Sequence, residues 1–210
     1  LLRFDDVTLG YGRESVLSGV RCEIERGDLT ALIGPNGSGK TTFLKAVLGQ
    51  ISPLKGTIAV VPGCRFAYVP QVDGMNLHWP MTVRDAVLLA QRARRPFGRL
   101  GPEELAAAES AMERVGVAKI AGRELRSVSG GQRQRAVLAQ ALSQKPEALL
   151  LDEPTRGLDV VAERDFLELV TELHAGGSLT VLLVTHSLPI ALNTARRILL
   201  FREGSVIATD

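Results

Sequence analysis

The sequence predicts an α/β fold in which a core of alternating strands and helices carries an antiparallel β subdomain and an α-helical insertion. Short apolar runs alternate with amphipathic helical segments in the first and last thirds of the chain. Loosely alternating apolar residues with glycine turns open the chain, as in antiparallel strands. From about residue 72 to 145 the pattern is helical. We therefore expect one domain over 1–210, with a core at about 1–71 and 146–210 and a helical subdomain at about 72–145.

The first third of the chain contains most of the expected strands. Apolar residues alternate along 2–11, and glycines at 10, 12, 19 and 27 mark the turns around the next strand. The apolar run at 29–33 is typical of a buried strand, and an amphipathic helix follows it from Phe43. The strands expected here are 2–11, 16–24, 29–33, 56–61 and 66–69.

The middle third predicts helices, and the last third returns to alternation. Val83, Val87 and Leu88 share one face of a first helix. A second helix begins at Pro102, because proline and the glutamates after it favour a helix start, and Gly116 is expected to end it. A third helix follows residue 129. Further on, strands are expected at 148–151, 180–185, 198–201 and 206–208, with helices at 160–174 and near residue 189.

Composition narrows the possible classes of function. The net charge is +2 and no long basic stripe accompanies it, which argues against a nucleic-acid partner. Two isolated cysteines are too few for a zinc site or a disulfide framework, and they favour a reducing compartment. No run approaches the roughly 18 apolar residues of a membrane span, and no signal peptide is visible. We therefore expect a globular protein without a membrane segment in this sequence.

A glycine-rich segment between the strand at 29–33 and the next helix carries the strongest functional signal. It fits the pattern G-x-x-x-x-G-K-[ST], in which backbone N–H groups surround a polyphosphate at a helix N-terminus. Lys40 can reach the β- and γ-phosphates, and the Thr41 hydroxyl can ligate Mg²⁺. A chance glycine-rich turn is the alternative. The segment predicts binding of a nucleoside triphosphate and consists of Gly34, Pro35, Asn36, Gly37, Ser38, Gly39, Lys40, Thr41 and Thr42.

Two acids end the expected strand at 148–151. Ligands of a parallel sheet gather outside the carboxyl ends of its strands, so Asp152 is a candidate Mg²⁺ ligand. Glu153, one residue further along, can polarise an attacking water. The alternative is a strand whose acidic end has no functional role.

A second candidate anion site opens the helix after residue 129. Ser129 suits the N-cap position, and Gly130, Gly131 and Gln132 follow it. One nucleotide does not obviously need two such sites from one chain. The second site is therefore expected to serve a nucleotide held by another molecule, and a flexible loop before a capped helix is the alternative.

Together these motifs resemble ATP-binding cassette (ABC) ATPases over essentially the whole chain. The stretch 128–132 is similar to the family signature, and 154–159 is similar to the loop that crosses the dimer interface. The resemblance implies a P-loop ATPase core, ATP and Mg²⁺ as cofactors, and an ATP-dependent head-to-tail dimer. It implies a catalytic group of Lys40, Gln71, Glu153 and His186, Mg²⁺ ligation by Thr41, Gln71 and Asp152, and nucleotide contacts from Tyr11, Ser129 to Gln132 and Asp159.

Single residues in that set also have simpler interpretations. Tyr11, which the resemblance places against adenine, could be an ordinary aromatic residue at the end of a strand. Gln71 could be a polar turn residue, and His186 a solvated residue after a strand. Arg156 and Gly157 depart from the small residues usual in the interface loop, which leaves the local contacts there open.

The stretch 79–83 suggests which ABC system the chain serves. It resembles the corresponding stretch of ATPases in the zinc, manganese and iron-chelate uptake group. Trp79 there could anchor a partner helix, or it could pack together with Met81 in a small helical core.

A lone cassette resembles the peripheral subunit of an importer at the cytoplasmic face of the cell membrane. The resemblance implies transmembrane permease subunits, an external solute-binding protein, and zinc or manganese as cargo. An exporter, a system for another cargo, and a soluble ABC ATPase of DNA maintenance or translation are the alternatives.

Overall fold

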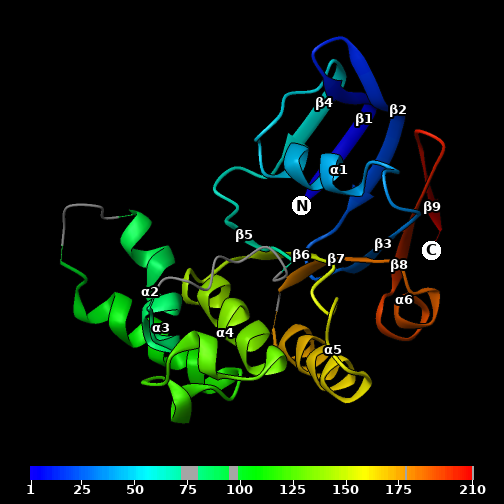
Figure 1. Ribbon diagram of the computed structural model, residues 1–210. Helices are drawn as coiled ribbons and strands as arrows, with labels where there is room; N and C mark the ends of the chain where they lie inside the picture. Colours follow the sequence, from blue (N-terminus) through cyan, green and yellow to red (C-terminus); the bar gives the residue numbers. More distant parts are fainter. Residues whose placement is uncertain (72–79, 95–98, 178, 210) are drawn as a thin grey trace. The chain divides into compact units, whose positions relative to one another are not determined.

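The computed structural model describes residues 1–71, 80–94, 99–177 and 179–209, and the chain divides into two compact units (Figure 1). Unit 1 contains Leu1–Phe66, Glu147–Glu153 and Leu173–Asp210, and unit 2 contains Ala67–Pro146 and Pro154–Glu172. Within the described ranges, no helix combines the length and the apolar character that crossing a membrane requires.

Unit 1 contains an antiparallel sheet with the strand order β2-β1-β4. Its strands are β1 (Leu2–Tyr11), β2 (Glu14–Ile24) and β4 (Lys55–Val60). Phe4 in the central strand lies opposite Cys22 of β2 on one side and Ile58 of β4 on the other. Leu2 and Phe4 are buried while the residue between them is exposed, so one face of the sheet covers the core.

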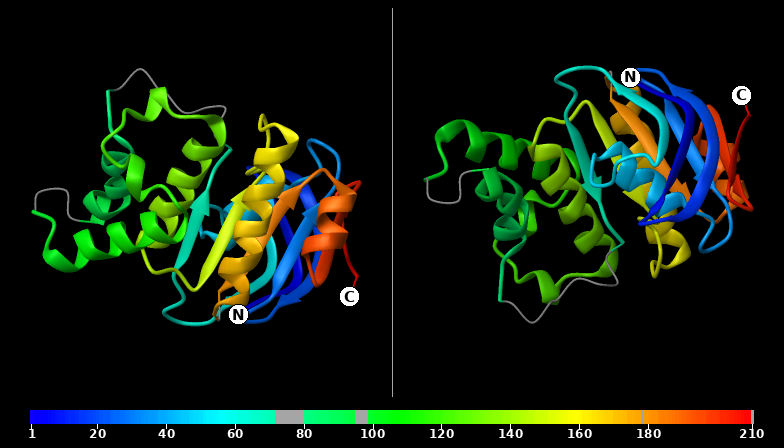
Figure 2. Two further views of the ribbon diagram at one scale, coloured as in Figure 1. Left: turned by 90° about the horizontal axis from the view of Figure 1, so that it is seen from below. Right: turned by 90° about the horizontal axis from the view of Figure 1, so that it is seen from above.

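The second sheet of unit 1 has four consecutive parallel strands in the order β6-β7-β3-β8, and β9 lies antiparallel beside β8. Figure 2 shows β3, β7 and β8 side by side from two directions. Because parallel strands run in the same direction, their carboxyl ends lie along one edge of the sheet. The strands are β3 (Leu29–Ile33), β6 (Ala148–Asp152), β7 (Thr180–Thr185), β8 (Arg197–Arg202) and β9 (Ser205–Thr209).

Two helices of unit 1 follow strands of this sheet. They are α1 (Lys40–Val47) after β3 and α6 (Leu188–Thr194) after β7. Phe43 of α1 stacks on Phe4 of β1, with ring centroids 4.5 Å apart, and meets Phe201 of β8 edge-on at 5.5 Å. All three rings are buried, and burying each one stabilises the fold by about 2 kcal/mol. This core fixes the end of β3 and the start of α1, between which the predicted phosphate loop lies.

Unit 2 is mostly helical. Its described helices are α2 (Val83–Arg94), α3 (Pro102–Arg114), α4 (Gly130–Ser143) and the first part of α5 (Val160–Ala175). The short turns η2 (Ala118–Ile120) and η3 (Leu125–Ser127) lie between α3 and α4, and β5 (Phe66–Val69) precedes the helices in the chain. Helix α4 packs against both α2 and α3. The buried Gln91 side chain of α2 donates a hydrogen bond of 2.6 Å to the Ser143 carbonyl of α4.

The order of strands and helices follows the sequence prediction, with most ends within two residues of those expected. Gly116 has a left-handed backbone (φ +76°) just beyond α3, where it was expected to end that helix. The two 3₁₀ turns were not predicted. Trp79, the proposed anchor for a partner helix, lies outside the described residues. The boundaries of the helical subdomain at about 72 and 145 stay a prediction.

Candidate functional site

The phosphate loop connects β3 to α1 in unit 1, as the motif predicted. Lys40 is only 6% exposed, and its ammonium donates hydrogen bonds to the carbonyls of Gly34 (2.8 Å) and Pro35 (2.9 Å). Gly39 precedes the helix with φ +98° and provides no side-chain cap. The N–H groups of the first turn are therefore left for an anion, which the helix dipole also favours.

Two features of the loop fit a bound phosphate. Ser38 Oγ is buried and, among the residues that the structure describes, has no hydrogen-bond partner. A Cβ at Gly34 would lie 2.4 Å from the Phe201 carbonyl oxygen and 2.7 Å from Ser38 Oγ, so only glycine fits there. A phosphate oxygen at the loop would satisfy the buried hydroxyl, which otherwise costs about 1–3 kcal/mol. The residues present therefore fit ATP.

Asp152 lies at the end of β6 and meets the phosphate loop. The Thr41 hydroxyl donates to Asp152 Oδ2 over 3.4 Å, so the structure brings together two of the residues predicted to hold Mg²⁺. A hydroxyl and a carboxylate oxygen are ligands that suit this cation.

The charge of Lys40 depends on the two acids at the end of β6. Burial lowers the pKa of Lys40, whereas the negative charges of Glu153 and Asp152 raise it. The two carboxylates therefore favour the charged form of the lysine, and burial opposes it.

Glu153 has a left-handed backbone, with φ +46°, which a residue with a side chain seldom adopts. Its N–H donates to the Val184 carbonyl of the neighbouring strand β7 over 3.2 Å. Strain of this kind costs about 1–3 kcal/mol and is common at functional positions. The conformation could not have been predicted from the sequence pattern, and Asp6, Lys145 and Glu203 share it.

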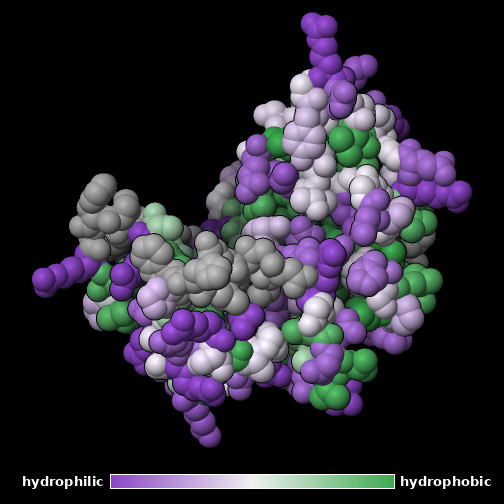
Figure 3. All heavy atoms as spheres, in the orientation of Figure 1, coloured by the Kyte–Doolittle hydropathy of each residue, from purple (hydrophilic) through white to green (hydrophobic). Residues whose placement is uncertain are grey.

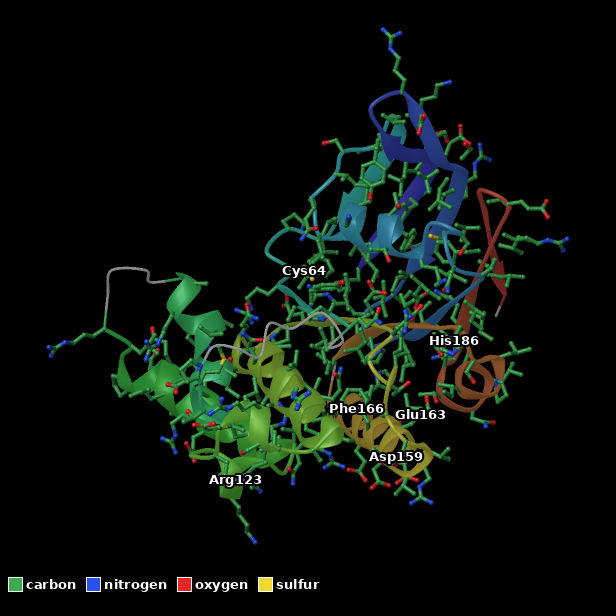
Figure 4. All side chains as sticks on the ribbon, viewed as in Figure 1. Cys64, Arg123, Asp159, Glu163, Phe166 and His186 are labelled. Atoms are coloured by element: carbon green, nitrogen blue, oxygen red, sulfur yellow. The ribbon has the colours of Figure 1, made fainter. Side chains whose placement is uncertain are left out.

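His186 directly follows β7 and is exposed. Figure 4 shows it beside the start of α6. The Ser187 N–H donates to Thr185 Oγ1 (3.1 Å), which helps to fix the turn around the histidine. Since β6 and β7 are parallel neighbours with Asp152 opposite Val184, His186 and the acids emerge at the same edge of the sheet.

Tyr11 ends β1, and its side chain is next to α1. The phenol oxygen lies 3.5 Å from Thr42 Oγ1 and accepts a hydrogen bond from Lys45 Nζ at 3.4 Å. The structure therefore places the predicted adenine platform beside the phosphate loop. Sequence reasoning missed Lys45, because only the fold shows that this helix position faces the end of β1.

The signature residues begin α4 in unit 2. Ser129 is the N-cap: its Oγ accepts from the Gln132 N–H, and its own N–H donates to Gln132 Oε1, each over 3.2 Å. A Cβ at Gly130 would meet Leu158 at 3.3 Å, and one at Gly131 would meet Ala162 at the same distance. The glycines therefore allow close packing against Leu158 before α5 and against Ala162 in its first turn, as well as access to the helix N-terminus.

Asp159 caps α5 in unit 2. Its Oδ1 accepts hydrogen bonds from the N–H groups of Val161 (3.0 Å) and Ala162 (2.9 Å), so the carboxylate has a structural role in the chain itself. In the same unit, Arg156 donates to Gln71 Oε1 over 3.4 Å. The arginine that departs from the family pattern thus contacts the glutamine that the resemblance assigns to catalysis and Mg²⁺ ligation.

The sequence matches the model of the ABC transporter family over residues 17–156. A zinc import ATP-binding protein ZnuC of Pseudomonas savastanoi is 38% identical over 199 residues, which are 94% of this chain and 71% of that protein. The protein of the same name from Cereibacter sphaeroides is 39% identical over 188 residues, covering 90% of this chain and 73% of the relative. The family resemblance predicted from the motifs is confirmed.

Solved structures agree with this family. A chain of an ABC transporter described as of the metal-chelate type, in an inward-facing conformation, superposes with a TM-score of 0.90 and 28% identity over 100% of this chain and 82% of its own. MJ1267, an ATP-binding cassette of an ABC transporter in its ADP conformation, gives a TM-score of 0.86 over 99% of this chain and 89% of its own, at 24% identity. The predicted fold class is therefore confirmed. The chain belongs to the ABC transporter family, as one of its ATP-binding, ATP-hydrolysing cassettes.

Proposed function

We propose that this cassette energises a membrane permease that imports a transition metal ion, zinc or manganese. The main support for ATP hydrolysis is the contact between Thr41 and Asp152, next to the buried Lys40. This arrangement suits Mg²⁺ and the terminal phosphates of ATP. The cargo is supported by relatives whose names state zinc import and by the resemblance of the stretch 79–83.

The proposed chemistry relies on positioning and charge neutralisation. Lys40 and the loop N–H groups would hold the phosphates, Thr41 and Asp152 would hold Mg²⁺, and Tyr11 would stack on adenine. The family resemblance adds Gln71 as a further Mg²⁺ ligand. Glu153 accepts a hydrogen bond from the attacking water, and His186 donates to γ-phosphate. When bound, Mg²⁺ would neutralise charge on the phosphate oxygens.

We also propose that the ATP-bound form is a head-to-tail dimer. In this arrangement Ser129 to Gln132 and Asp159 of one copy contact the nucleotide held by the other copy. The surface next to Asp159 is suited to contact with a partner, because the apolar side chains of Val160 and Val161 at the start of α5 are 81% and 60% exposed. Figure 3 shows hydrophobic surface in the region of α5.

The remaining assignments concern the cell. The cassette would lie at the cytoplasmic face of the membrane, with its helical subdomain at about 72–145 docked on the permease. A solute-binding protein outside the membrane would deliver the metal ion. ATP-driven closure of the dimer would then move the docked permease helices, since ATP favours one of two states.

Growth of a deletion strain under metal chelation tests this function. Deletion should impair growth with a chelator, and added zinc or manganese should restore it. A plasmid with the wild-type gene should also restore growth, whereas the same plasmid with Glu153→Gln should not. Unchanged metal uptake after deletion, in a strain without a second importer, would reject the cargo and leave the ATPase assignment intact.

A further inference from the structure

Lys45 lies beside the proposed adenine platform and is not part of the phosphate-loop motif. Its ammonium donates to the Tyr11 phenol oxygen at 3.4 Å, and Thr42 Oγ1 lies 3.5 Å from the same oxygen. Both partners come from α1, in which residues three apart share a face. One helix face therefore contacts the tip of the tyrosine at two points.

The ring of Tyr11 remains accessible in this arrangement. The residue is 48% exposed, and the Lys45 ammonium is 5.5 Å from the ring centroid but only 3.4 Å from the phenol oxygen. The ammonium thus acts on the oxygen more than on the π-face. The contact leaves ring surface available for stacking on a base.

Both ends of the contact are held by regular structure. Tyr11 pairs with Glu14 in the β1–β2 hairpin, whose tight turn contains Gly12 at φ +60°. Phe43 and Leu44, next to Thr42 and Lys45 in α1, are buried in the core of unit 1. A side chain on a rigid helix can therefore orient an aromatic ring on a rigid hairpin.

We propose that Lys45 is a positioning residue that orients Tyr11 for stacking on the base of an adenine nucleotide. The proposal deepens the proposed function and rests on it. Without the lysine, the half-exposed Tyr11 side chain populates more rotamers. Nucleotide binding then has a higher cost in side-chain entropy. Lys45 thus contributes to affinity for the base and not for the phosphates.

The electrostatics of the tyrosine support this geometry. The hydrogen bond with Thr42 lowers the pKa of Tyr11, and Lys45 lowers it further through its hydrogen bond and its charge, while burial acts in the opposite direction. Both contacts therefore favour the same position of the phenol oxygen.

We would measure the affinities of ATP and of tripolyphosphate by calorimetry without Mg²⁺. Because tripolyphosphate lacks the base and ribose, the comparison separates contacts to the base from contacts to the phosphates. Lys45→Ala should weaken ATP binding about 3- to 10-fold, the size expected for one hydrogen bond, and leave tripolyphosphate binding unchanged. Lys45→Arg, which keeps a donor of similar reach, should restore most of the affinity. In a Tyr11→Phe background, which keeps the ring and removes the oxygen, Lys45→Ala should have little further effect.

Several outcomes would overturn the proposal. Equal losses for ATP and tripolyphosphate would mean that Lys45 acts directly on the phosphates. An undiminished effect of Lys45→Ala in the Tyr11→Phe background would mean that it does not act through the phenol oxygen. Unchanged ATP affinity in Lys45→Ala would reject it outright. Failure of the unmodified chain to bind ATP would instead count against the proposed function.

Discussion

At the scale of single residues, Glu153 combines a catalytic assignment with an unusual backbone. Its φ of +46° favours glycine, and its N–H is engaged by Val184 in the neighbouring strand. Glu203 has a similar φ of +48° in the exposed turn between β8 and β9, away from the acidic strand. Glu203 is therefore a control for Glu153: both residues have the same backbone strain, but only Glu153 has a proposed role in ATP hydrolysis.

We predict that Glu153→Gly and Glu203→Gly have similar, small effects on stability. Relief of left-handed strain and the greater freedom of unfolded glycine act in opposite directions, so each free energy of unfolding should change by at most about 1 kcal/mol. Only Glu153→Gly should lose ATP turnover. Urea unfolding and an ATPase assay measure the two effects, and a loss of turnover in both variants would contradict the prediction.

Glu153→Gln tests the chemistry without changing the size of the side chain. The amide oxygen is a much weaker base than a carboxylate, so turnover should fall by about 10²–10³-fold, as for other single positioned groups. ATP binding should be retained, because Lys40 and the loop are unchanged. Near-normal turnover would remove Glu153 from the mechanism.

The two cysteines should react more slowly than a simple thiol, because the pKa of each thiol is raised. Burial raises the pKa of Cys22 to about 12, and burial together with Glu147 raises the pKa of Cys64. Since the thiolate is the reactive form, Cys22 should be alkylated at pH 8 roughly a thousandfold more slowly than a thiol of ordinary pKa. Mass spectrometry of the folded chain, with the urea-unfolded chain as control, measures this. Rapid labelling of folded Cys22 would contradict its burial on β2.

At the scale of elements, the strands and helices could be predicted because their signals are local. Apolar periodicity, Pro102 at a helix start and Gly116 beyond a helix end require no knowledge of distant residues. The phosphate loop and the acidic strand could be predicted for the same reason, since each is a short motif between recognisable elements. The strand orders β2-β1-β4 and β6-β7-β3-β8 were not predicted, because pairing depends on distant parts of the chain.

Side-chain contacts between elements also could not be predicted from the sequence. Lys45 next to Tyr11 joins positions 34 residues apart, and Arg156 next to Gln71 joins positions 85 apart. The left-handed backbone at Glu153 depends on the neighbouring strand β7. Such features follow from tertiary structure, where local propensity carries no signal.

The connection between β3 and α1 depends on glycine for steric reasons. At Gly34 an added Cβ would overlap the backbone oxygen of Phe201 at 2.4 Å, and backbone atoms cannot easily move aside. We predict that Gly34→Ala destabilises the fold by about 1–3 kcal/mol and weakens ATP binding. Gly122→Ala is the control, because a Cβ there would have nothing within 4 Å. Equal stability of the two variants in thermal unfolding would show that the loop tolerates the methyl group.

At the scale of the whole molecule, the surface beside Asp159 offers a test of the proposed ATP-bound dimer. Val160 is 81% exposed in the first turn of α5, directly after the residue that caps the helix. An aspartate at this position suits the helix N-terminus, so Val160→Asp should not destabilise the isolated chain. In a close dimer the added charge would lose contact with water, which disfavours association.

We predict that Glu153→Gln forms a dimer with ATP and Mg²⁺, and that adding Val160→Asp shifts it toward monomer. Leu192→Asp in α6 is the matched control, since Leu192 is a 62% exposed apolar residue in unit 1. Sedimentation with and without ATP measures the equilibrium, and ATP affinity of the monomers should stay equal among the three variants. If Glu153→Gln remains monomeric at high protein concentration with ATP, the dimer proposal fails. If it dimerises but Val160→Asp and Leu192→Asp behave alike, the dimer stands and the patch at the start of α5 lies outside its interface.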